Sequence, residues 1–271
     1  VTAGAVQSNH CRATALVAAQ LGLDCHLVLR ADGDSVSTTG NFLMDQMAGA
    51  SYEILPSLGW GRGVKEAFSR VATSCLKAGR PALLIPTGGS DSLGVWGYIA
   101  AAEELRGDLI QAGIDRATVV LATGSAGTQT GLTAGAVLHE LPVTVVGYAV
   151  CDDAEWFNAR ICADWRASVT RWPQLPDIAL APITRDHSVG PGYGKAEPAI
   201  YELIIELTRL EGIPLDPVYT GKAFHGLITD IEAGHYDDVD DIIFVHTGGV
   251  FGLFSHEASL LKAAASTPVV E

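Results

Sequence analysis

The sequence lacks the apolar runs and the positive charge that several protein classes need. No apolar run approaches the roughly 20 residues that span a membrane. The first residues, Val-Thr-Ala-Gly, have neither the charge nor the length of a secretory signal peptide. Only 17 Lys and Arg oppose 31 Asp and Glu, so the net charge is −14. This charge disfavours nucleic acids and anionic membranes as partners, and we expect a cytoplasmic protein that acts on a small molecule.

Paired cysteines and clustered histidines are also missing. The five cysteines are scattered and none is in a Cys-x-x-Cys pair, so neither a disulfide framework nor a zinc site is indicated. The eight histidines show no ligand-like spacing, and we predict no metal. What the chain does have is 48% hydrophobic residues over 271 positions, enough for one large or two modest globular domains.

Helix-like and strand-like segments alternate along the chain with short links, which predicts an α/β protein. Strands are expected over residues 1–6, 25–29, 51–55, 80–85, 117–121, 143–150 and 241–245. Helices are expected over residues 12–21, 41–47, 64–77, 96–110, 131–138, 198–210 and 223–232. The polar, proline-containing segment 165–186 predicts an irregular surface connection, and residues 187–194 predict a flexible glycine-rich loop.

One loop is the main candidate for a ligand-binding site. Gly124-Ser125-Ala126-Gly127-Thr128 follows the strand expected over residues 117–121 and leads into a helix. Backbone N–H groups at such a turn point at one spot and can hold a phosphate. The alternative is a tight turn in which glycine only relieves backbone strain, and the residues alone leave both open. The loop is neither a P-loop nor a Gly-x-Gly-x-x-Gly fingerprint.

Two further glycine and hydroxyl loops, residues 86–94 and 246–252, also follow expected strands. Open α/β sheets bind ligands in the crevice at such strand ends, so a ligand site is predicted there. Ser8 or Asn9 is a plausible N-cap for the first helix. Tyr193, among glycines, is either a packing residue or the lid of a site.

Six motifs occur in order along nearly the whole chain. They are Gln-Ser-Asn-His at 7–10, Ile-Pro-Thr-Gly-Gly-Ser at 85–90, Gly-Ser-Ala-Gly-Thr at 124–128, Pro-Gly-Tyr-Gly at 191–194, Leu-Asp-Pro-Val-Tyr-Thr-Gly-Lys at 215–222 and His-Thr-Gly-Gly at 246–249. With these motifs the chain resembles the pyridoxal-phosphate enzymes of the tryptophan-synthase-β-like fold, specifically the D-cysteine desulfhydrase and 1-aminocyclopropane-1-carboxylate deaminase group. The resemblance implies two open-sheet α/β domains of fold type II, a smaller one over residues 1–94 and a larger, cofactor-binding one over residues 95–271. It also implies a homodimer.

The resemblance implies a role for individual residues toward pyridoxal 5′-phosphate. The backbone of Gly124, Ser125, Ala126, Gly127 and Thr128 would bind the cofactor phosphate. Asn9 would hydrogen-bond the ring hydroxyl, Thr247 would face the pyridine nitrogen, and Thr220 would also bind the cofactor.

Toward the substrate, the resemblance implies a binding set of Ser8, Asn9, His10 and Tyr193. Ser8, with the partial positive charge of its helix N-terminus, would hold the substrate carboxylate or assist proton transfer. Tyr193 would close over the substrate, and Tyr219 would lie against the cofactor ring near the reacting carbons. Ser8, Tyr193 and Tyr219 are therefore the predicted catalytic residues.

The implied reaction is β-elimination on a sulfur-containing amino acid, with loss of the Cα proton and of the sulfur substituent on Cβ. D-Cysteine would give pyruvate, sulfide and ammonium, and L-cysteate would give sulfite in place of sulfide. The neutral Thr247 hydroxyl cannot keep the pyridine nitrogen protonated as a carboxylate can, which favours elimination. The deaminase branch has Glu and Leu where this chain has Thr220 and Thr247, so ring opening of the cyclopropane substrate is the disfavoured alternative.

The lysine that binds the cofactor covalently in this group lies upstream of the Gln-Ser-Asn stretch. The lysines present here are Lys65, Lys77, Lys195, Lys222 and Lys262, and none is in that context. We expect an N-terminal segment to supply the missing lysine. Without such a segment, the other reading is a homologue that binds the cofactor but does not turn over substrate.

Overall fold

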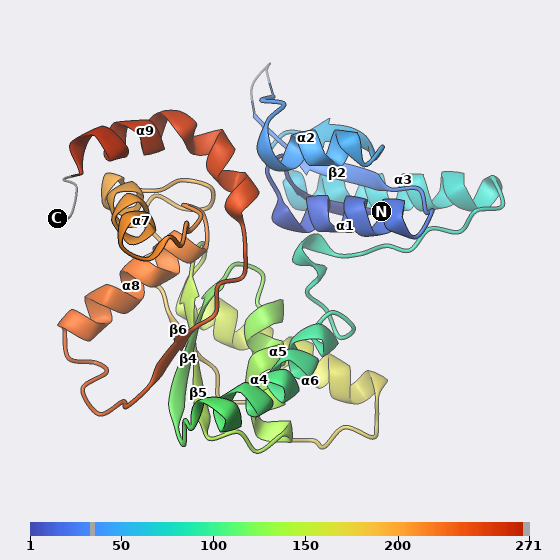
Figure 1. Cartoon of the computed structure of the whole chain (residues 1–271). Helices are drawn as coiled ribbons and strands as arrows, with labels where there is room; N and C mark the ends of the chain where they lie inside the picture. The colour runs from blue at the N-terminus through green and yellow to red at the C-terminus, as the bar shows by residue number, and fades with distance from the viewer. Residues whose placement is uncertain (33–35, 268–271) are drawn as a thin grey trace. The chain divides into compact units, whose positions relative to one another are not determined.

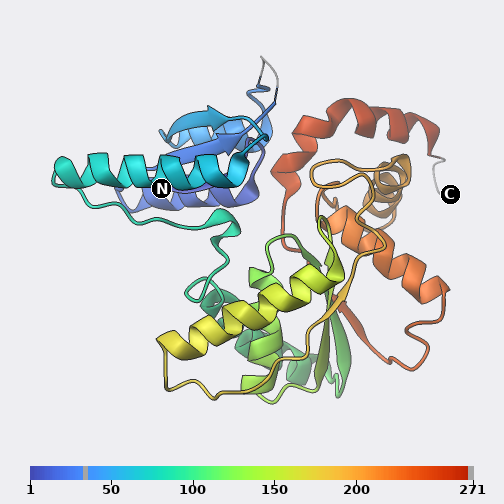
Figure 2. The same cartoon turned by 180° about the vertical axis from the view of Figure 1, so that it is seen from behind.

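In a computed structural model, which describes residues 1–32 and 36–267, the chain divides into two compact units. Unit 1 comprises residues 1–89 and 251–255, and unit 2 comprises residues 90–250 with the chain from residue 256 onward. We describe each unit by itself (Figures 1 and 2). The domain boundary expected after residue 94 stays a prediction.

Unit 1 is built on a parallel three-stranded sheet. Its strands are β1 (Thr2–Ala5), β2 (His26–Arg30) and β3 (Ser51–Leu55), in the order β1-β2-β3. Leu27 and Leu29 of β2 pack with α1 (Asn9–Gln20) and α2 (Gly40–Met47), whereas Val28 packs with α3 (Trp60–Lys77). Because side chains alternate along a strand, the sheet is covered by helices on both faces.

The strand expected over residues 80–85 is wrong. The segment makes isolated bonds beside β1: Ile85 N donates to Val1 O at 2.9 Å, and the Val1 amino group donates to Leu83 O at 2.9 Å. Pro81 and Pro86 at its ends have no N–H to continue a ladder. The segment therefore reaches η1 (Thr87–Gly89) as irregular chain.

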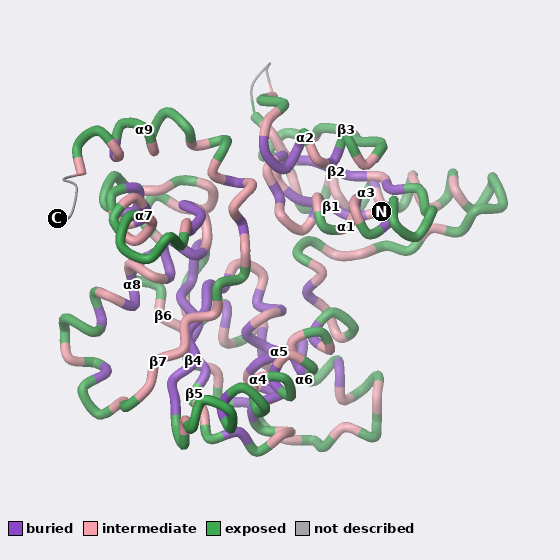
Figure 3. Tube along the Cα trace, in the orientation of Figure 1, coloured by how far each residue is buried: buried purple, intermediate pink, exposed green. Residues whose placement is uncertain are grey.

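Unit 2 is built on a parallel four-stranded sheet in the order β6-β5-β4-β7. The strands are β4 (Ala117–Thr123), β5 (Val143–Ala149), β6 (Ile183–Arg185) and β7 (Ile242–Phe244). In the register, Val119 of β4 lies opposite Val145 of β5 and Ile243 of β7. Every residue of β4 is buried, and Figure 3 shows this central strand in purple.

Helices cover both faces of this sheet as well. Three helices pack on one face: α4 (Trp96–Ala112), α5 (Gly127–Leu138) and α6 (Ala154–Arg171). On the other face α8 (Thr220–Glu232) packs through Ala223 and Leu227. Behind it α7 (Pro198–Glu211) contacts α8, and α9 (Glu257–Ser266), which follows η2 (Val250–His256), contacts α7 (Figure 1).

The irregular connection expected over residues 165–186 is confirmed for residues 172–182 and is wrong at its two ends. Residues 165–171 form the last turns of α6, which begins after the N-cap Asp153, and residues 183–185 form β6. Phe157, Ile161 and Trp165 are four residues apart, so they lie on one helix face, and all three are buried. Burial of these three side chains stabilises the helix, although the residues on its opposite face are polar.

The remaining expected strands and helices are confirmed as elements, and the parallel sheets confirm the α/β class. Four helices begin about one turn earlier than predicted: α1 at Asn9, α3 at Trp60, α5 at Gly127 and α8 at Thr220. The first turns of α3, α5 and α8 carry glycine or Thr, and α1 begins with Asn9; these residues favour caps and turns over helix interiors. Among the described residues, no helix combines the length and apolar character that crossing a membrane requires.

Candidate functional site

The predicted phosphate loop forms a tight strand-to-helix turn in unit 2. Ala126, the N-cap residue of α5, has φ of 74°, a left-handed conformation that is costly for any residue except glycine. Gly127 N donates to Ser90 Oγ at 3.1 Å, and Ser90 Oγ lies 2.8 Å from Ser125 Oγ. A Cβ at Gly127 would lie 2.5 Å from Ser90 Oγ, so this approach requires glycine.

The first turn of α5 keeps donors available for an anion. The N–H groups of Thr128 and Gln129 have no acceptor among the described residues. The turn carries no acidic residue, and the helix N-terminus adds partial positive charge. The turn can therefore accept a phosphate through backbone donors.

Two tyrosines lie beside this turn. A Cβ at Gly124 would lie 2.7 Å from Tyr219 Cε1, so the ring packs directly on the glycine backbone. The hydroxyls of Tyr219 and Tyr193 are 2.7 Å apart, and their rings meet edge to face with centroids 5.9 Å apart. Burial, the largest cause, and the neighbouring Tyr193 raise the pKa of Tyr219 well above its usual value. Tyr219 therefore stays protonated at neutral pH.

Asp216 holds the chain around Tyr219. Its carboxylate accepts from the backbone N–H groups of Val218, Tyr219 and Thr220 at 2.9 Å, and from Thr220 Oγ1 at 2.8 Å. In return Asp216 N donates to Thr220 Oγ1 at 2.9 Å. The fully buried Thr220 hydroxyl is thus used within the chain, and its predicted role as a cofactor contact stays a prediction.

Thr247 follows β7, at the same sheet edge as the phosphate loop, because the carboxyl ends of parallel strands lie together. The Thr247 side chain is exposed. Its neighbour His246 lies 3.1 Å from Pro214 O through Nε2 and accepts from Gly248 N through Nδ1 at 3.0 Å. These bonds fix the loop on both sides of Thr247.

Ser8, Asn9 and His10 belong to unit 1. Ser8 is the N-cap of α1, and its hydroxyl accepts from Cys11 N at 3.1 Å. Asn9 Oδ1 accepts from Asn41 Nδ2 at 2.9 Å. Because its oxygen is occupied, Asn9 has its two amide N–H donors to offer a ligand.

His10 is held neutral. Thr2 Oγ1 donates its one hydrogen to Ile85 O at 3.0 Å and lies 2.7 Å from His10 Nε2. Thr2 Oγ1 must therefore accept a hydrogen bond from His10, so the ring is protonated at Nε2. Burial lowers the pKa of His10 to about 4. In this form Nδ1 is an acceptor only, so His10 cannot supply positive charge to a substrate carboxylate at neutral pH.

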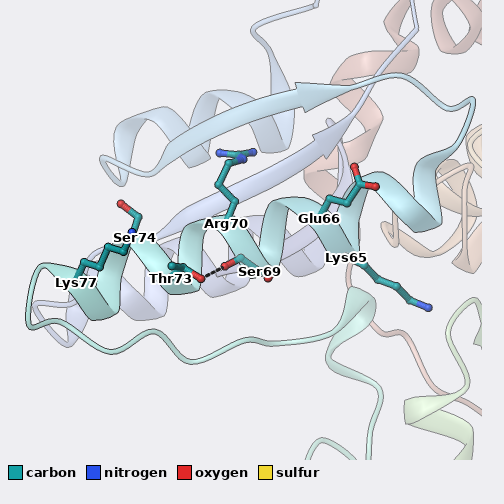
Figure 4. A pocket seen from close by; sticks show the side chains of 7 residues that line it. All are labelled: Lys65, Glu66, Ser69, Arg70, Thr73, Ser74 and Lys77. Atoms are coloured by element: carbon teal, nitrogen blue, oxygen red, sulfur yellow. Dashed lines mark hydrogen bonds between the residues drawn. The ribbon is translucent and has the colours of Figure 1, made fainter.

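The structure thus brings the phosphate loop, Tyr219 and Tyr193 together in unit 2, and Ser8, Asn9 and His10 together in unit 1. Sequence reasoning missed the residues that hold these groups: Ser90, Asp216 and Asn41. Ser90 and Asp216 lie in motifs that the sequence shows, at 85–90 and 215–222, whereas Asn41 has no such signal. A shallow hollow along α3, between Lys65 and Lys77 (Figure 4), contains none of the predicted site residues.

The sequence is similar to known proteins. A family model described as "Pyridoxal-phosphate dependent enzyme" matches residues 1–248. The chain is 34% identical to the Arabidopsis thaliana mitochondrial bifunctional D-cysteine desulfhydrase/1-aminocyclopropane-1-carboxylate deaminase, over 94% of this chain and 64% of the relative. It is 36% identical to the D-cysteine desulfhydrase of Salmonella choleraesuis (strain SC-B67), over 94% of this chain and 77% of the relative. The chain thus spans less than two thirds of the Arabidopsis protein.

Solved structures agree on the fold. A crystal structure of an ACC deaminase homologue superposes with a TM-score of 0.84 at 32% identity, over 97% of this chain and 77% of that one. The Escherichia coli diaminopropionate ammonia lyase superposes with a TM-score of 0.62 at 12% identity, over 98% of this chain and 68% of that one, which shows the shared fold alone. The chain therefore belongs to the family of pyridoxal-phosphate-dependent enzymes and has their tryptophan-synthase-β-like, fold type II architecture.

Proposed function

We propose that the chain acts as a pyridoxal-phosphate-dependent lyase that eliminates the sulfur substituent of a small amino acid. D-Cysteine is the proposed substrate, with pyruvate, sulfide and ammonium as products. The observation that carries the proposal is the packing of Tyr219 on Gly124, beside the anion-binding turn of α5. The names of the Arabidopsis and Salmonella relatives support this substrate. We also propose a homodimeric, cytoplasmic enzyme.

The residues present fit the phosphate group of the cofactor. The turn offers backbone donors at Thr128 and Gln129, and side chains at positions 124 and 127 would fill the space taken by Tyr219 and Ser90. A phosphate monoester is the anion that such a helix N-terminus binds well. We therefore propose Gly124, Ser125, Ala126, Gly127 and Thr128 as the phosphate-binding residues.

When bound, pyridoxal phosphate supplies an electron sink for the carbanion left by loss of the Cα proton. In unit 2 the chain itself supplies a hydrogen-bond donor. Tyr219 Oη holds its proton at neutral pH and is hydrogen-bonded to Tyr193 Oη at 2.7 Å. We propose that this pair donates a hydrogen bond to the departing sulfur. The neutral Thr247 hydroxyl is proposed to face the ring nitrogen, an environment that favours elimination.

The proposed substrate-binding set adds Ser8, Asn9 and His10. Ser8 Oγ accepts from Cys11 N, and we propose that its O–H donates to the substrate carboxylate. Asn9 offers amide N–H donors to the ring hydroxyl, and Asn41 fixes the direction in which these donors point. His10 is proposed as a neutral acceptor, since burial holds its pKa near 4.

A second candidate is deamination of 1-aminocyclopropane-1-carboxylate, because the Arabidopsis relative carries both names. We rank it below D-cysteine, because Thr220 and Thr247 stand where the deaminase branch has Glu and Leu. L-Cysteate sulfo-lyase activity and cofactor binding without turnover are the remaining alternatives.

The test is a pyridoxal-phosphate titration followed by turnover assays with the three substrates. Saturable binding, seen as quenching of tryptophan fluorescence, and sulfide release from D-cysteine are expected. Release of sulfite from L-cysteate alone, or of ring-opened keto acid alone, would replace the proposed substrate. Cofactor binding without any turnover would support the alternative of a homologue that binds the cofactor but does not turn over substrate.

Two matched variants test whether cofactor binding depends on the turn. Gly124→Ala is expected to weaken cofactor binding roughly tenfold or more, because its Cβ displaces the Tyr219 ring. Gly107→Ala, exposed in α4 with nothing within 4 Å of the added Cβ, should leave binding unchanged. Equal affinity of both variants for the cofactor would show that the turn is not part of the cofactor site.

A further inference from the structure

Lys222 is a buried lysine that the proposed chemistry does not use. It lies in the first turn of α8, and only 1% of its surface is exposed. Its Nζ donates to three backbone carbonyl oxygens: Val150 O at 3.3 Å, Val189 O at 2.8 Å and Gly192 O at 2.8 Å. Burying a charged group is costly unless it is paired and hydrogen-bonded, and here the ammonium has three partners.

The three bonds account for the whole donor capacity of the side chain. An ammonium group has three N–H donors and no acceptor, and each donor here meets one carbonyl oxygen. Burial, the largest cause, lowers the pKa of Lys222, yet only the charged form can donate to all three oxygens. With its nitrogen occupied in this way, Lys222 is not available as a nucleophile.

Two of the three carbonyls belong to the loop that carries Tyr193. This loop has positive φ at Gly190, Gly192 and Gly194, of 60°, 104° and 75°. Such a glycine-rich stretch loses much conformational entropy on ordering. The third carbonyl, Val150 O, lies directly after β5, so the ammonium ties the loop to the sheet edge.

The loop is anchored separately at its start. His187 Nε2 lies 3.6 Å from Asp230 Oδ1, and its ring packs edge to face on Tyr148 with centroids 5.8 Å apart. These contacts precede the Lys222 contacts in the chain and do not reach Tyr193. Directly beyond Gly192, the Tyr193 hydroxyl is bonded to that of Tyr219.

We propose that Lys222 is a positioning residue: its ammonium acts as a built-in monovalent cation in a cage of three carbonyl oxygens, and through Val189 and Gly192 it holds Tyr193 against Tyr219. The inference deepens the proposed function, because the catalytic consequence depends on the role of Tyr193 there. The loop geometry itself does not depend on that role.

The first test is hydrogen exchange of the 187–197 amides in Lys222→Met, which keeps the apolar stem and removes the ammonium. Loss of hydrogen bonds to a charged donor should speed exchange in the Tyr193 loop roughly tenfold to hundredfold. Lys195→Met, an exposed lysine of the same loop, is the matched control and should exchange like the wild type. Unchanged exchange in Lys222→Met overturns the inference.

Cation rescue separates positioning from a general loss of packing. In Lys222→Ala the cage is left with space and three unpaired oxygens, which suit K⁺ or NH₄⁺ because these cations prefer oxygen ligands at similar distances. Slowing of loop exchange by KCl, but not by the same concentration of tetramethylammonium chloride, is expected. Equal effects of the two salts would contradict the cation cage.

A measurement on the unmodified protein covers the case in which both variants fail to fold. Of the five lysines, one side-chain ammonium should show slowed proton exchange by NMR of isotope-labelled lysine, because its donors are occupied and buried. If all lysine ammonium groups exchange freely, the inference fails. Absence of D-cysteine turnover with a protected loop would instead count against the proposed function alone.

Discussion

Gly249 lies against the carboxylate of Asp216: a Cβ at position 249 would be 2.8 Å from Asp216 Cγ. Asp216 uses that carboxylate to hold the first backbone N–H groups of α8 and the turn that carries Tyr219. The loop after β7 therefore packs directly on the residue that organises the start of α8. This contact explains why a glycine with φ of 89° stands there.

Gly249→Ala is expected to destabilise the protein by about 2 to 4 kcal/mol, because the left-handed conformation and the clash with Asp216 add together. Urea unfolding measures the loss. The control is Gly248→Ala, with φ of 88° but nothing within 4 Å of its Cβ, which should cost only about 1 to 2 kcal/mol from the backbone conformation. Equal losses would show that Asp216 yields to the added methyl group.

Ser90→Ala should reduce both stability and cofactor affinity. Ser90 is 2% exposed and its hydroxyl accepts from Gly127 N, so removal of the hydroxyl leaves a buried donor unpaired at a cost of about 1 to 3 kcal/mol. Denaturant unfolding and a pyridoxal-phosphate titration would measure the two effects. Ser92→Ala in the same loop is the control, since that hydroxyl accepts a long 3.4 Å hydrogen bond from the exposed Arg171. A Ser90 variant as stable as the Ser92 variant would refute this role.

Asn41→Asp tests the network that orients Asn9. Asn41 is fully buried, and its Nδ2 donates to Gln7 O and Asn9 Oδ1. An aspartate turns these two donor contacts into contacts between acceptors but strengthens the bond from Arg12 Nε at 3.0 Å, so we expect a net loss of roughly 1 to 3 kcal/mol at neutral pH. Gln46→Glu makes the same chemical change at an exposed position of α2 and should be nearly silent. Comparable thermal stability of the two variants would contradict the network.

Asp45 predicts a pH dependence of stability. It is fully buried, neither of its oxygens has a hydrogen-bond partner among the described residues, and burial raises its pKa from 3.8 to about 7. The folded state therefore keeps a proton that the unfolded state loses. Stability falls as pH rises from about 4 to about 7, by up to about 4 kcal/mol.

Asp45→Asn removes this titration. The decrease in unfolding free energy between pH 4 and pH 8 should be smaller in the variant than in the wild type, whatever the absolute stability. Urea unfolding across this range measures it, with the exposed Asp24→Asn as the control. A wild-type pH profile retained in Asp45→Asn would assign the dependence to other groups.

The sequence by itself determined the features that depend on near neighbours. The strand-loop-helix order at residues 117–138, the cap at Ser8 and the glycine and hydroxyl loops follow from residues within one or two turns of each other. The spacing of Phe157, Ile161 and Trp165 also predicts α6, although the prolines beyond it led us to expect an irregular connection. Residues 80–85 show the converse: apolar residues there favour a strand, but prolines at both ends prevent a ladder.

Only the tertiary structure decided which distant groups meet. Ser90 meets Gly127, Asp216 meets Gly249, and Lys222 meets the carbonyls of Val189 and Gly192. These residues are 30 or more positions apart, and a single hydrogen bond or close approach leaves no periodic pattern in a sequence. Their partners are set by the order of parallel strands, which brings several loops to one sheet edge. Composition and motif therefore predicted the kind of site, and the sheet topology selected the residues that hold it in place.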